Sequence, residues 1–195
     1  MSMIGFIGPP CSGKSTCAAN LFSHLKDDGY PAEFLPEAAR TYIVNKRVEN
    51  MKLNHADGPL LPIDQLKIFL MAAHNEHIFI KGSPKSLTVT DSASFLAFLY
   101  LPVESRNLQE FTIAKNISKK FDLLFRCHPV IPSSQIADSN RKHSFDESLI
   151  LDTYLDNLIR DLDIPTSKIV ELSGTAQDRS RQTLYHTMEL IVCPR

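Results

Sequence analysis

The chain alternates between short apolar runs and longer segments with helical periodicity. Met3–Ile7 is an apolar run that ends at Gly8 and is typical of a buried strand. After it, Cys17, Leu21 and Leu25 recur at four-residue spacing, which predicts a helix from Gly13 to about Lys26. The same alternation continues, and it predicts further strands at Ala32–Pro36, Leu87–Thr90, Phe121–Cys127 and Lys168–Leu172.

Helical patterns fill most of the chain between these strands. The longest predicted helix begins at Ile63 and ends at Gly82, and we expect its buried stripe to contain Ile63, Leu66, Leu70, Ala73, His77 and Ile80. The other predicted helices are Glu37–Val48, Ser94–Leu101, Leu108–Lys119, Asp146–Leu162 and Ala176–Ile191. Strands that alternate with helices predict an α/β fold in which a five-stranded parallel sheet carries helices on both faces.

Length and composition favour one globular domain spanning residues 1–195. Hydrophobic residues make up 43% of the chain and charged residues 22%, which excludes a disordered or fibrous protein. Pro129–Ser144 is polar, irregular and rich in Pro, Ser and Asn, so we expect a short lid at about residues 129–146. The net charge of −1 provides no global field that would attract DNA or an anionic membrane.

The sequence also lacks the signals of a membrane or secreted protein. No apolar run approaches the roughly 20 residues that span a bilayer, and the N-terminus has no basic segment of a signal peptide. The four cysteines, Cys11, Cys17, Cys127 and Cys193, form no C-x-x-C pair. We therefore expect a cytoplasmic protein with reduced thiols and no membrane partner. The sequence does not define an oligomeric state.

One motif indicates chemistry strongly. Residues 8–16 read Gly-Pro-Pro-Cys-Ser-Gly-Lys-Ser-Thr and match G-x-x-x-x-G-K-[ST] between a strand and a helix. In such a loop, backbone N–H groups and the helix N-terminus bind the phosphates of ATP. Lys14, expected to face solvent, would reach the β- and γ-phosphates, and the Ser15 hydroxyl would ligate Mg²⁺. The predicted ATP-binding residues are Gly8, Pro10, Cys11, Ser12, Gly13, Lys14, Ser15 and Thr16.

Two acidic residues follow predicted strands at the edge where ligands bind in α/β sheets. Asp91 ends the Leu87–Thr90 strand and would hold Mg²⁺ with Ser15 or take a proton from an acceptor hydroxyl; the alternative is a helix N-cap. Glu37 would act as general base or orient the acceptor, with Arg40 three residues on as a binding group; the alternative is a surface ion pair. The sequence does not decide which carboxylate is the base.

Two further groups have a functional and a structural interpretation. Asp138, Arg141, Lys142 and His143 lie in the expected lid, where Arg141 would support the transferring phosphoryl group; the alternative is a solvated loop. Phe95, Phe98 and Tyr100 form an apolar cluster that is typical of a core. Because the cluster closely follows Asp91, stacking of its rings on the acceptor is the alternative, with Phe95 as the candidate contact residue.

In this order the motifs resemble those of P-loop kinases of the nucleoside and nucleotide kinase type, and among them the AAA_28-type family, which includes ribosylnicotinamide kinase domains. The resemblance rests on Gly8–Ser15, Glu37-x-x-Arg40, Thr90-Asp91-Ser92, Phe121–Leu124 and Asp138-x-x-Arg141. It implies transfer of the γ-phosphate of ATP to a hydroxyl with Mg²⁺, without identifying the acceptor. The chain lacks the Asp-Arg-Tyr/His that follows the third strand in thymidylate kinases.

Three functions are therefore compatible with the sequence. The first is a kinase for a small nucleoside- or nucleotide-like acceptor. The second, suggested by phage members of the resembling group, is a kinase for 5-hydroxymethyluracil in DNA. It would need a basic rim, which the net charge does not favour and for which the candidates are Lys46, Arg47, Lys52, Lys115, Lys119 and Lys120. The third is a nucleotide-binding ATPase switch. The absence of an N-K-x-D motif favours ATP over GTP.

Overall fold

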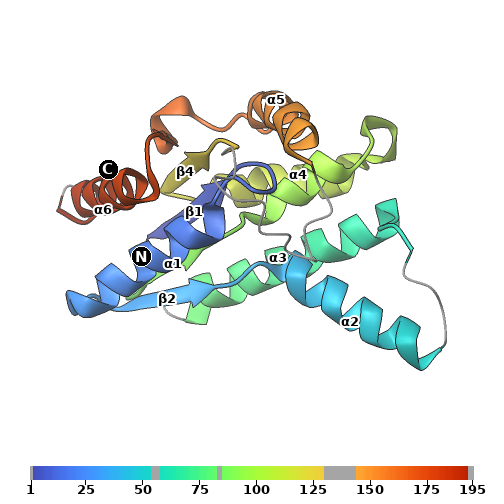
Figure 1. Ribbon diagram of the computed structural model, residues 1–195, viewed down its shortest axis with the longest axis horizontal. Helices are drawn as coiled ribbons and strands as arrows, with labels where there is room; N and C mark the ends of the chain where they lie inside the picture. The colour runs from blue at the N-terminus through green and yellow to red at the C-terminus, as the bar shows by residue number, and fades with distance from the viewer. Residues whose placement is uncertain (1, 54–57, 83–84, 130–143, 193–195) are drawn as a thin grey trace.

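The computed structural model describes residues 2–53, 58–82, 85–129 and 144–192 (Figure 1). Its five strands form one sheet in the order β2-β3-β1-β4-β5, and every neighbouring pair is parallel. The strands are β1 (Met3–Ile7), β2 (Ala32–Leu35), β3 (Leu87–Thr90), β4 (Leu123–Cys127) and β5 (Ile169–Leu172). The predicted five-stranded parallel sheet is thus confirmed, with strand ends shifted by two residues at most.

The helices also follow the sequence pattern closely. They are α1 (Lys14–Asp27), α2 (Ala38–Lys52), α3 (Pro62–Gly82), α4 (Leu108–Ser118), α5 (Phe145–Asp161) and α6 (Ala176–Val192). The helix expected over residues 94–101 is a 3₁₀-helix, η1 (Ser94–Tyr100). The short turns η2 (Val103–Ser105) and η3 (Thr166–Lys168) complete the set. Ser144 and Glu147 form a capping box at the start of α5, so the last two residues of the expected lid belong to this helix.

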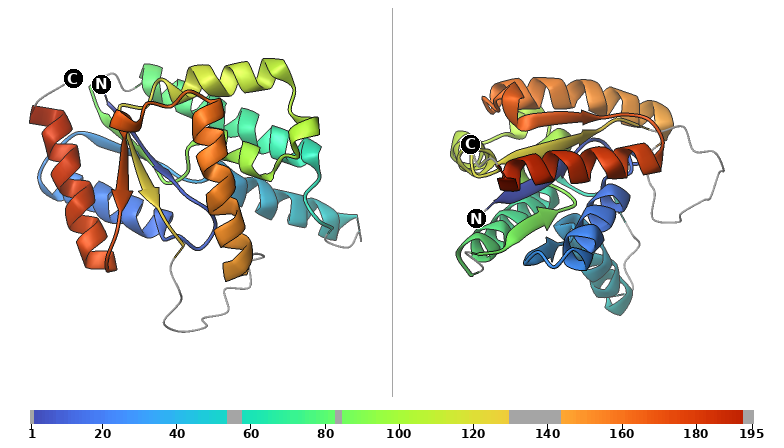
Figure 2. Two further views of the ribbon diagram at one scale, coloured as in Figure 1. Left: turned by 90° about the horizontal axis from the view of Figure 1, so that it is seen from above. Right: turned by 90° about the vertical axis from the view of Figure 1, so that its left-hand side faces the viewer.

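Helices cover both faces of the sheet (Figure 2). Side chains alternate along β1: Met3 and Ile7 pack into a core shared with α3, η1, α4 and α5. Ile4 and Phe6 pack into a second core against α1 and α6. Because both faces of the central strand are buried, β1 can be apolar along its whole length, which is why it reads as a continuous hydrophobic run in the sequence.

The buried face of α3 differs from the predicted stripe. Ile63 and Leu70 are 53% and 47% exposed, and the buried residues are Asp64, Gln65, Ile68, Phe69, Ala73 and Glu76. The prediction assigned the helix face from the spacing of mostly apolar residues. The structure instead buries two carboxylates, each of which accepts several hydrogen bonds there.

Helix α2 projects from the body of the molecule and is fastened to α3 by one of these carboxylates (Figure 1). Asp64 accepts hydrogen bonds from the Tyr42 hydroxyl at 2.6 Å, from the Leu61 backbone N–H at 2.8 Å and from the Lys46 ammonium. Burial raises the pKa of Asp64, but the hydrogen bonds from Lys46 and Tyr42 outweigh it and lower the pKa to about 2.

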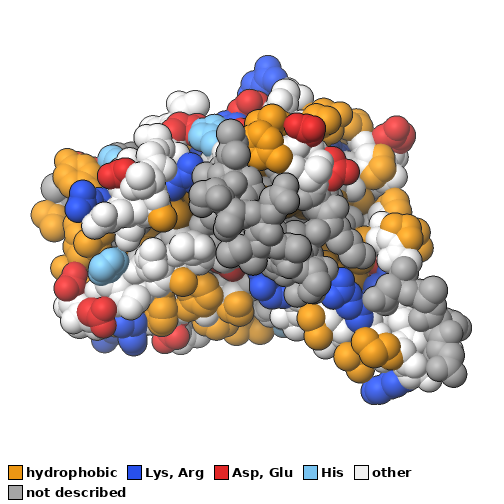
Figure 3. Space-filling view, viewed as in Figure 1, with side chains coloured by type: hydrophobic (Ala, Val, Ile, Leu, Met, Phe, Trp, Pro, Cys, Tyr) orange, Lys and Arg blue, Asp and Glu red, His pale blue; other side chains and the backbone are white. Residues whose placement is uncertain are grey.

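Beyond this attachment, α2 is largely exposed. Ala38 is its only buried residue, and apolar and basic side chains lie together on the projecting end (Figure 3). The exposed apolar residues there are Val44, Val48, Met51 and Leu53. Within the described segments, every helix is too short or too polar to pass through a lipid bilayer.

Candidate functional site

A curled loop connects the central strand β1 to α1. Gly8, Cys11 and Gly13 have positive φ angles of 147°, 61° and 85°. Backbone segments that include left-handed residues form concave nests of N–H groups that bind anions. Gly8 is also required sterically, because a Cβ at this position would lie 2.2 Å from the carbonyl oxygen of Cys127 in β4. The loop is therefore shaped by its own backbone and by the neighbouring strand.

The end of α1 that faces this loop favours negative charge. The helix begins at Lys14 and has no acidic residue in its first turn, so the positive end of its dipole is not neutralised there. Ser12, which is fully buried, donates its hydroxyl to the Pro9 carbonyl at 2.8 Å. A loop and helix end of this kind can bind an anion.

The side chain of Lys14 folds back onto the loop. Its Nζ donates hydrogen bonds to the carbonyl oxygens of Gly8 at 2.9 Å and Pro9 at 2.7 Å. Burial lowers the pKa of Lys14, and the negative charges of Glu37 and Asp91 oppose this effect. The expectation that Lys14 faces solvent is therefore wrong: its ammonium is partly buried, because the curled backbone offers it two carbonyl acceptors.

Asp91 comes directly after β3 and is 7% exposed. Burial raises its pKa, and a hydrogen bond from the Ser15 hydroxyl opposes the increase. Its Oδ1 is buried and has no hydrogen-bond partner among the described residues. The alternative N-cap role is wrong, since η1 is preceded by Ala93 and receives no side-chain cap from Asp91.

The side-chain oxygen atoms of Asp91 and Ser15 are suitable ligands for a magnesium ion. A buried carboxylate oxygen without a hydrogen donor costs free energy unless a cation satisfies it. Mg²⁺ prefers oxygen ligands and binds proteins through one or two carboxylates together with substrate phosphates. Asp91 and the hydroxyl of Ser15, the pair predicted from the sequence, are the residues that would hold the ion at the start of α1.

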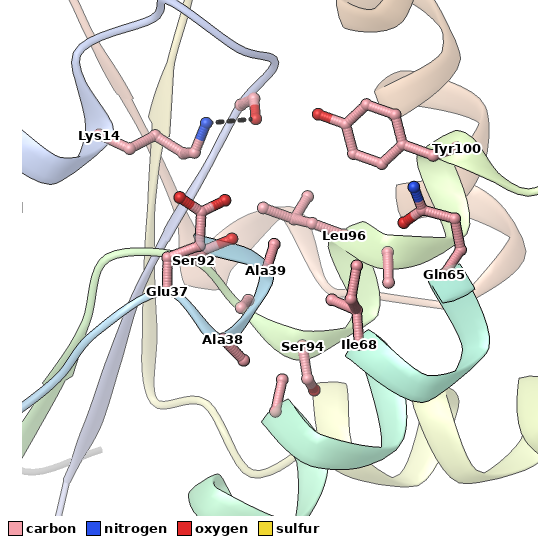
Figure 4. Close-up of a pocket in the computed structure, with 14 residues that line it drawn as sticks. Lys14, Glu37, Ala38, Ala39, Gln65, Ile68, Ser92, Ser94, Leu96 and Tyr100 are labelled. Carbon is pink, nitrogen blue, oxygen red and sulfur yellow. Dashed lines mark hydrogen bonds between the residues drawn. The ribbon is translucent and has the colours of Figure 1, made fainter. Parts of the chain in front are cut away.

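A pocket opens beside the loop, between α2, α3 and η1. Figure 4 shows Lys14 and Glu37 on one side of it and Gln65 and Tyr100 on the other. Glu37 is placed there by the turn from β2 into α2, where it is the N-cap residue. Gln65 was not predicted, whereas Tyr100 belongs to the aromatic cluster for which stacking on the acceptor was the alternative interpretation. Gln65 lies on the buried face of α3 that the apolar pattern did not identify.

The 3₁₀ geometry of η1 explains which of its aromatic residues reaches the pocket. With three residues per turn, Ser94, Ala97 and Tyr100 share one face, and all three line the pocket. Phe95 is fully buried and packs edge-to-face on Phe121 at a centroid distance of 5.9 Å. The prediction that Phe95 contacts the acceptor is therefore wrong. Burial and the negative charge of Glu37 raise the pKa of Tyr100, so its phenol stays protonated.

The remaining predicted residues lie elsewhere. Arg40 is exposed on α2 and is not among the described residues that line the pocket, although its charge lowers the pKa of Asp91. Thr16 is exposed in the first turn of α1, and Pro10 and Cys11 are partly exposed in the loop. The lid residues Asp138, Arg141, Lys142 and His143 lie outside the described residues.

The lysines proposed as a basic rim do not gather around the pocket. Lys115 is in the last turn of α4 and pairs with Asp163, and Lys119 and Lys120 follow α4 and precede β4. In a parallel sheet the segments that precede the strands lie at the edge opposite the loop after β1. Lys46 is paired with Asp64. The expected rim is thus divided between two ends of the molecule.

Sequence reasoning also missed Arg179 of α6. This buried side chain donates from Nη1 to the Ser12 carbonyl at 3.0 Å and from Nε to the Gly174 carbonyl at 3.3 Å. It fixes the outer side of the phosphate-binding loop from a helix at the far end of the chain. No local signal marks such a residue, because an arginine on an amphipathic helix is usually solvated.

A parallel sheet with this loop between its central strand and the following helix defines a nucleotide-binding protein of the P-loop NTPase fold. A family model confirms the class more narrowly: AAA_28, described as "AAA domain", matches residues 3–179. The chain belongs to the AAA_28 family, as the motifs predicted.

One solved structure extends the comparison to the fold. The crystal structure of "NadR protein in complex with NR" is similar with a TM-score of 0.64 at 17% sequence identity. The match covers 96% of this chain and 51% of that chain, so the protein spans about half the length of its structural relative. No curated protein sequence matches the chain significantly.

Proposed function

We propose that the chain is an ATP-dependent kinase that transfers the γ-phosphate to a hydroxyl of a small nucleoside-like acceptor. The observation that carries the proposal is the pocket that lies between Lys14 and Glu37 on one side and Tyr100 on the other. A nucleotide switch needs no such second pocket, whereas a kinase must hold an acceptor next to the transferred phosphate.

The two carboxylates have different surroundings, and we assign them different roles. Asp91 has a buried Oδ1 without a partner among the described residues and would hold Mg²⁺, which neutralises phosphate charge during transfer. Glu37 is partly exposed and faces the pocket, so it is the better placed group to accept the proton of an acceptor hydroxyl. Lys14 would exchange its loop carbonyls for phosphate oxygens.

The lining of the pocket favours a nucleoside over a nucleotide. Lys14 is the only cation among the described lining residues, and it lies on the ATP side. Ile68 and Leu96 provide apolar walls, while Gln65 and Tyr100 offer hydrogen bonds to ring or sugar groups. An acceptor that already carried a phosphate would face the carboxylate of Glu37 without a cation of its own. The similar NadR structure is a complex with NR, which agrees in kind with this acceptor class.

Two parts of the proposal rest on sequence alone. We propose that residues 1–195 act as a single kinase domain and that the segment at about 129–146 is its lid, with Arg141 supporting the transferring phosphoryl group. Arg141→Ala should lower the turnover rate more than it weakens ATP binding, because the arginine acts on charge that spreads in the transition state. Lys142→Ala is the matched control and should have a smaller effect, because an ammonium lacks the fork of donors.

The experiment is a screen for transfer of labelled γ-phosphate from ATP with Mg²⁺. It should include free nucleosides, nicotinamide riboside, nucleoside monophosphates, and DNA with and without 5-hydroxymethyluracil. We expect transfer to a nucleoside, and loss of transfer by at least about a thousandfold in Lys14→Ala with ATP-analogue binding still measurable. Labelling of the modified DNA alone would establish the DNA kinase instead, and ATP hydrolysis without any labelled acceptor would indicate the ATPase switch.

A further inference from the structure

A buried carboxylate that the proposed chemistry does not use lies behind the pocket. Glu76 of α3 is 1% exposed. Its Oε1 accepts a hydrogen bond from the backbone N–H of Ser94 at 2.7 Å, and its Oε2 accepts one from the Ser94 hydroxyl at 2.6 Å. Both oxygens of one buried side chain therefore hold a single residue, the first residue of η1.

This attachment sets the position of η1 beside the pocket. No side chain caps η1 from its own N-terminus, and Glu76 supplies the missing acceptor from another helix. At a rise of about 2 Å per residue, Tyr100 lies roughly 12 Å along the 3₁₀-helix from Ser94, so a small rotation at Ser94 displaces the Tyr100 ring considerably. The residues between them that share the face include Ala97, which also lines the pocket.

Glu76 lies next to the main pocket but is not among the described residues that line it. A smaller void is lined by Glu76 and shares Ala38, Ala72 and Ser92 with the main pocket. No described hydrogen bond joins Glu76 to the phosphate-binding loop, whose contacts come from Lys14, Ser12 and Arg179. A change at Glu76 should therefore reach the acceptor and leave ATP binding nearly untouched.

We propose that Glu76 is a positioning residue for the acceptor: by holding Ser94 at both its N–H and its hydroxyl, it fixes the pocket wall that carries Tyr100. This rests on the proposed function insofar as the pocket binds the acceptor. The attachment of η1 itself is a property of the fold and is tested separately.

The first arm of the test is kinetic. Glu76→Ala removes both acceptors, whereas Glu76→Gln keeps a carbonyl for the Ser94 N–H and an amide group for its hydroxyl. With nicotinamide riboside, or the nucleoside that the screen identifies as a better acceptor, we expect Glu76→Ala to raise the acceptor KM about tenfold and the ATP KM less than twofold. Glu76→Gln should restore most of the acceptor KM, and Ser94→Ala, which loses the hydroxyl bond alone, should change it in the same direction by less.

The second arm follows the structure by hydrogen exchange. Peptides that cover Ser94–Tyr100 should exchange at least about tenfold faster in Glu76→Ala, while peptides from Gly8–Ser15 keep their protection. Leu25→Ala is the control, since Leu25 is buried in the other core, at the far end of α1. It should lower overall stability without changing the ratio of the two KM values.

The outcomes separate the two proposals. Equal increases of both KM values in Glu76→Ala, or the same pattern in Leu25→Ala, would reduce Glu76 to a general structural residue. Unchanged exchange over η1 would overturn the attachment whether or not an acceptor is found. If wild-type protein labels no acceptor, the proposed function fails, and exchange over η1 then decides alone whether Glu76 fixes the wall.

Discussion

Arg179 and Ser12 are joined by a hydrogen bond of 3.0 Å although 167 residues separate them in the sequence. The donor is a buried guanidinium on α6, and the acceptor is a backbone carbonyl of the phosphate-binding loop. The shape of this loop therefore depends on the C-terminal helix as well as on its own glycines.

Replacing Arg179 should loosen the loop. Arg179→Ala leaves the carbonyls of Ser12 and Gly174 without their donor, which costs on the order of 1–3 kcal/mol of stability. We expect ATP-analogue affinity to fall about tenfold, measured by calorimetry together with the melting temperature. Arg181→Ala removes an exposed arginine from the same helix and should change neither quantity. Equal losses in both variants would mean that charge, and not the bond to Ser12, matters.

Replacing Asp91 should lower activity without lowering stability in the absence of Mg²⁺. Its buried Oδ1 has no partner among the described residues and burial raises its pKa, so without Mg²⁺ the ionised carboxylate is unfavourable there. Asp91→Asn should therefore melt at the same or a higher temperature than wild type in the absence of Mg²⁺ and nucleotide. In the transfer assay the same variant should be at least about a hundredfold slower. A less stable variant with normal turnover would contradict the magnesium role.

Two of the aromatic residues of η1, Phe95 and Tyr100, should respond in opposite ways. Phe95→Ala opens a cavity in the core and should lower the unfolding free energy by about 3–5 kcal/mol. Tyr100→Phe keeps the ring that lines the pocket and removes its hydroxyl, so stability should stay within about 1 kcal/mol of wild type while the acceptor KM rises. Urea unfolding and steady-state kinetics on the same preparations distinguish the two. An acceptor KM that is insensitive to Tyr100 would remove this residue from the site.

Glu76 should give stability a characteristic pH dependence. Burial raises its pKa from 4.5 to about 7, so between these values the folded protein binds more protons than the unfolded chain. The contribution of this group to stability is therefore present below about pH 4.5 and is lost as the pH rises to about 7.

Glu76→Gln removes that titration. Relative to wild type, its unfolding free energy should improve by up to about 3 kcal/mol between about pH 4.5 and pH 8, as measured by urea unfolding across this range. Asp64 provides the contrast: its pKa is lowered to about 2, so its contribution is lost only as the pH falls from about 3.8 toward 2. A constant difference between Glu76→Gln and wild type would contradict the raised pKa.

Sequence patterns predicted the parts of the structure that are determined by residues close together in the chain. The apolar strands, the turn-forming glycines of residues 8–13 and the position of Glu37 after a strand all follow from neighbouring residues. The contribution of Glu76 does not, because a buried carboxylate on α3 is stable only through partners that the fold brings from elsewhere. The choice of Tyr100 over Phe95 depends on a 3₁₀ period of three, whereas Phe95 was selected from the sequence for its closeness to Asp91.

The strand order also determines when the phosphate-binding loop can form during synthesis. β2 pairs only with β3, and β1 pairs with β3 and β4, so none of the described strand pairs can form before residue 87 has been made. At about 5–20 residues per second, the ribosome needs roughly 4–16 s to travel from β1 to β3. During this interval the apolar strand that will carry the loop has no sheet partner. A nascent chain with this topology must therefore be kept from associating through β1 until β3 and β4 emerge beside it.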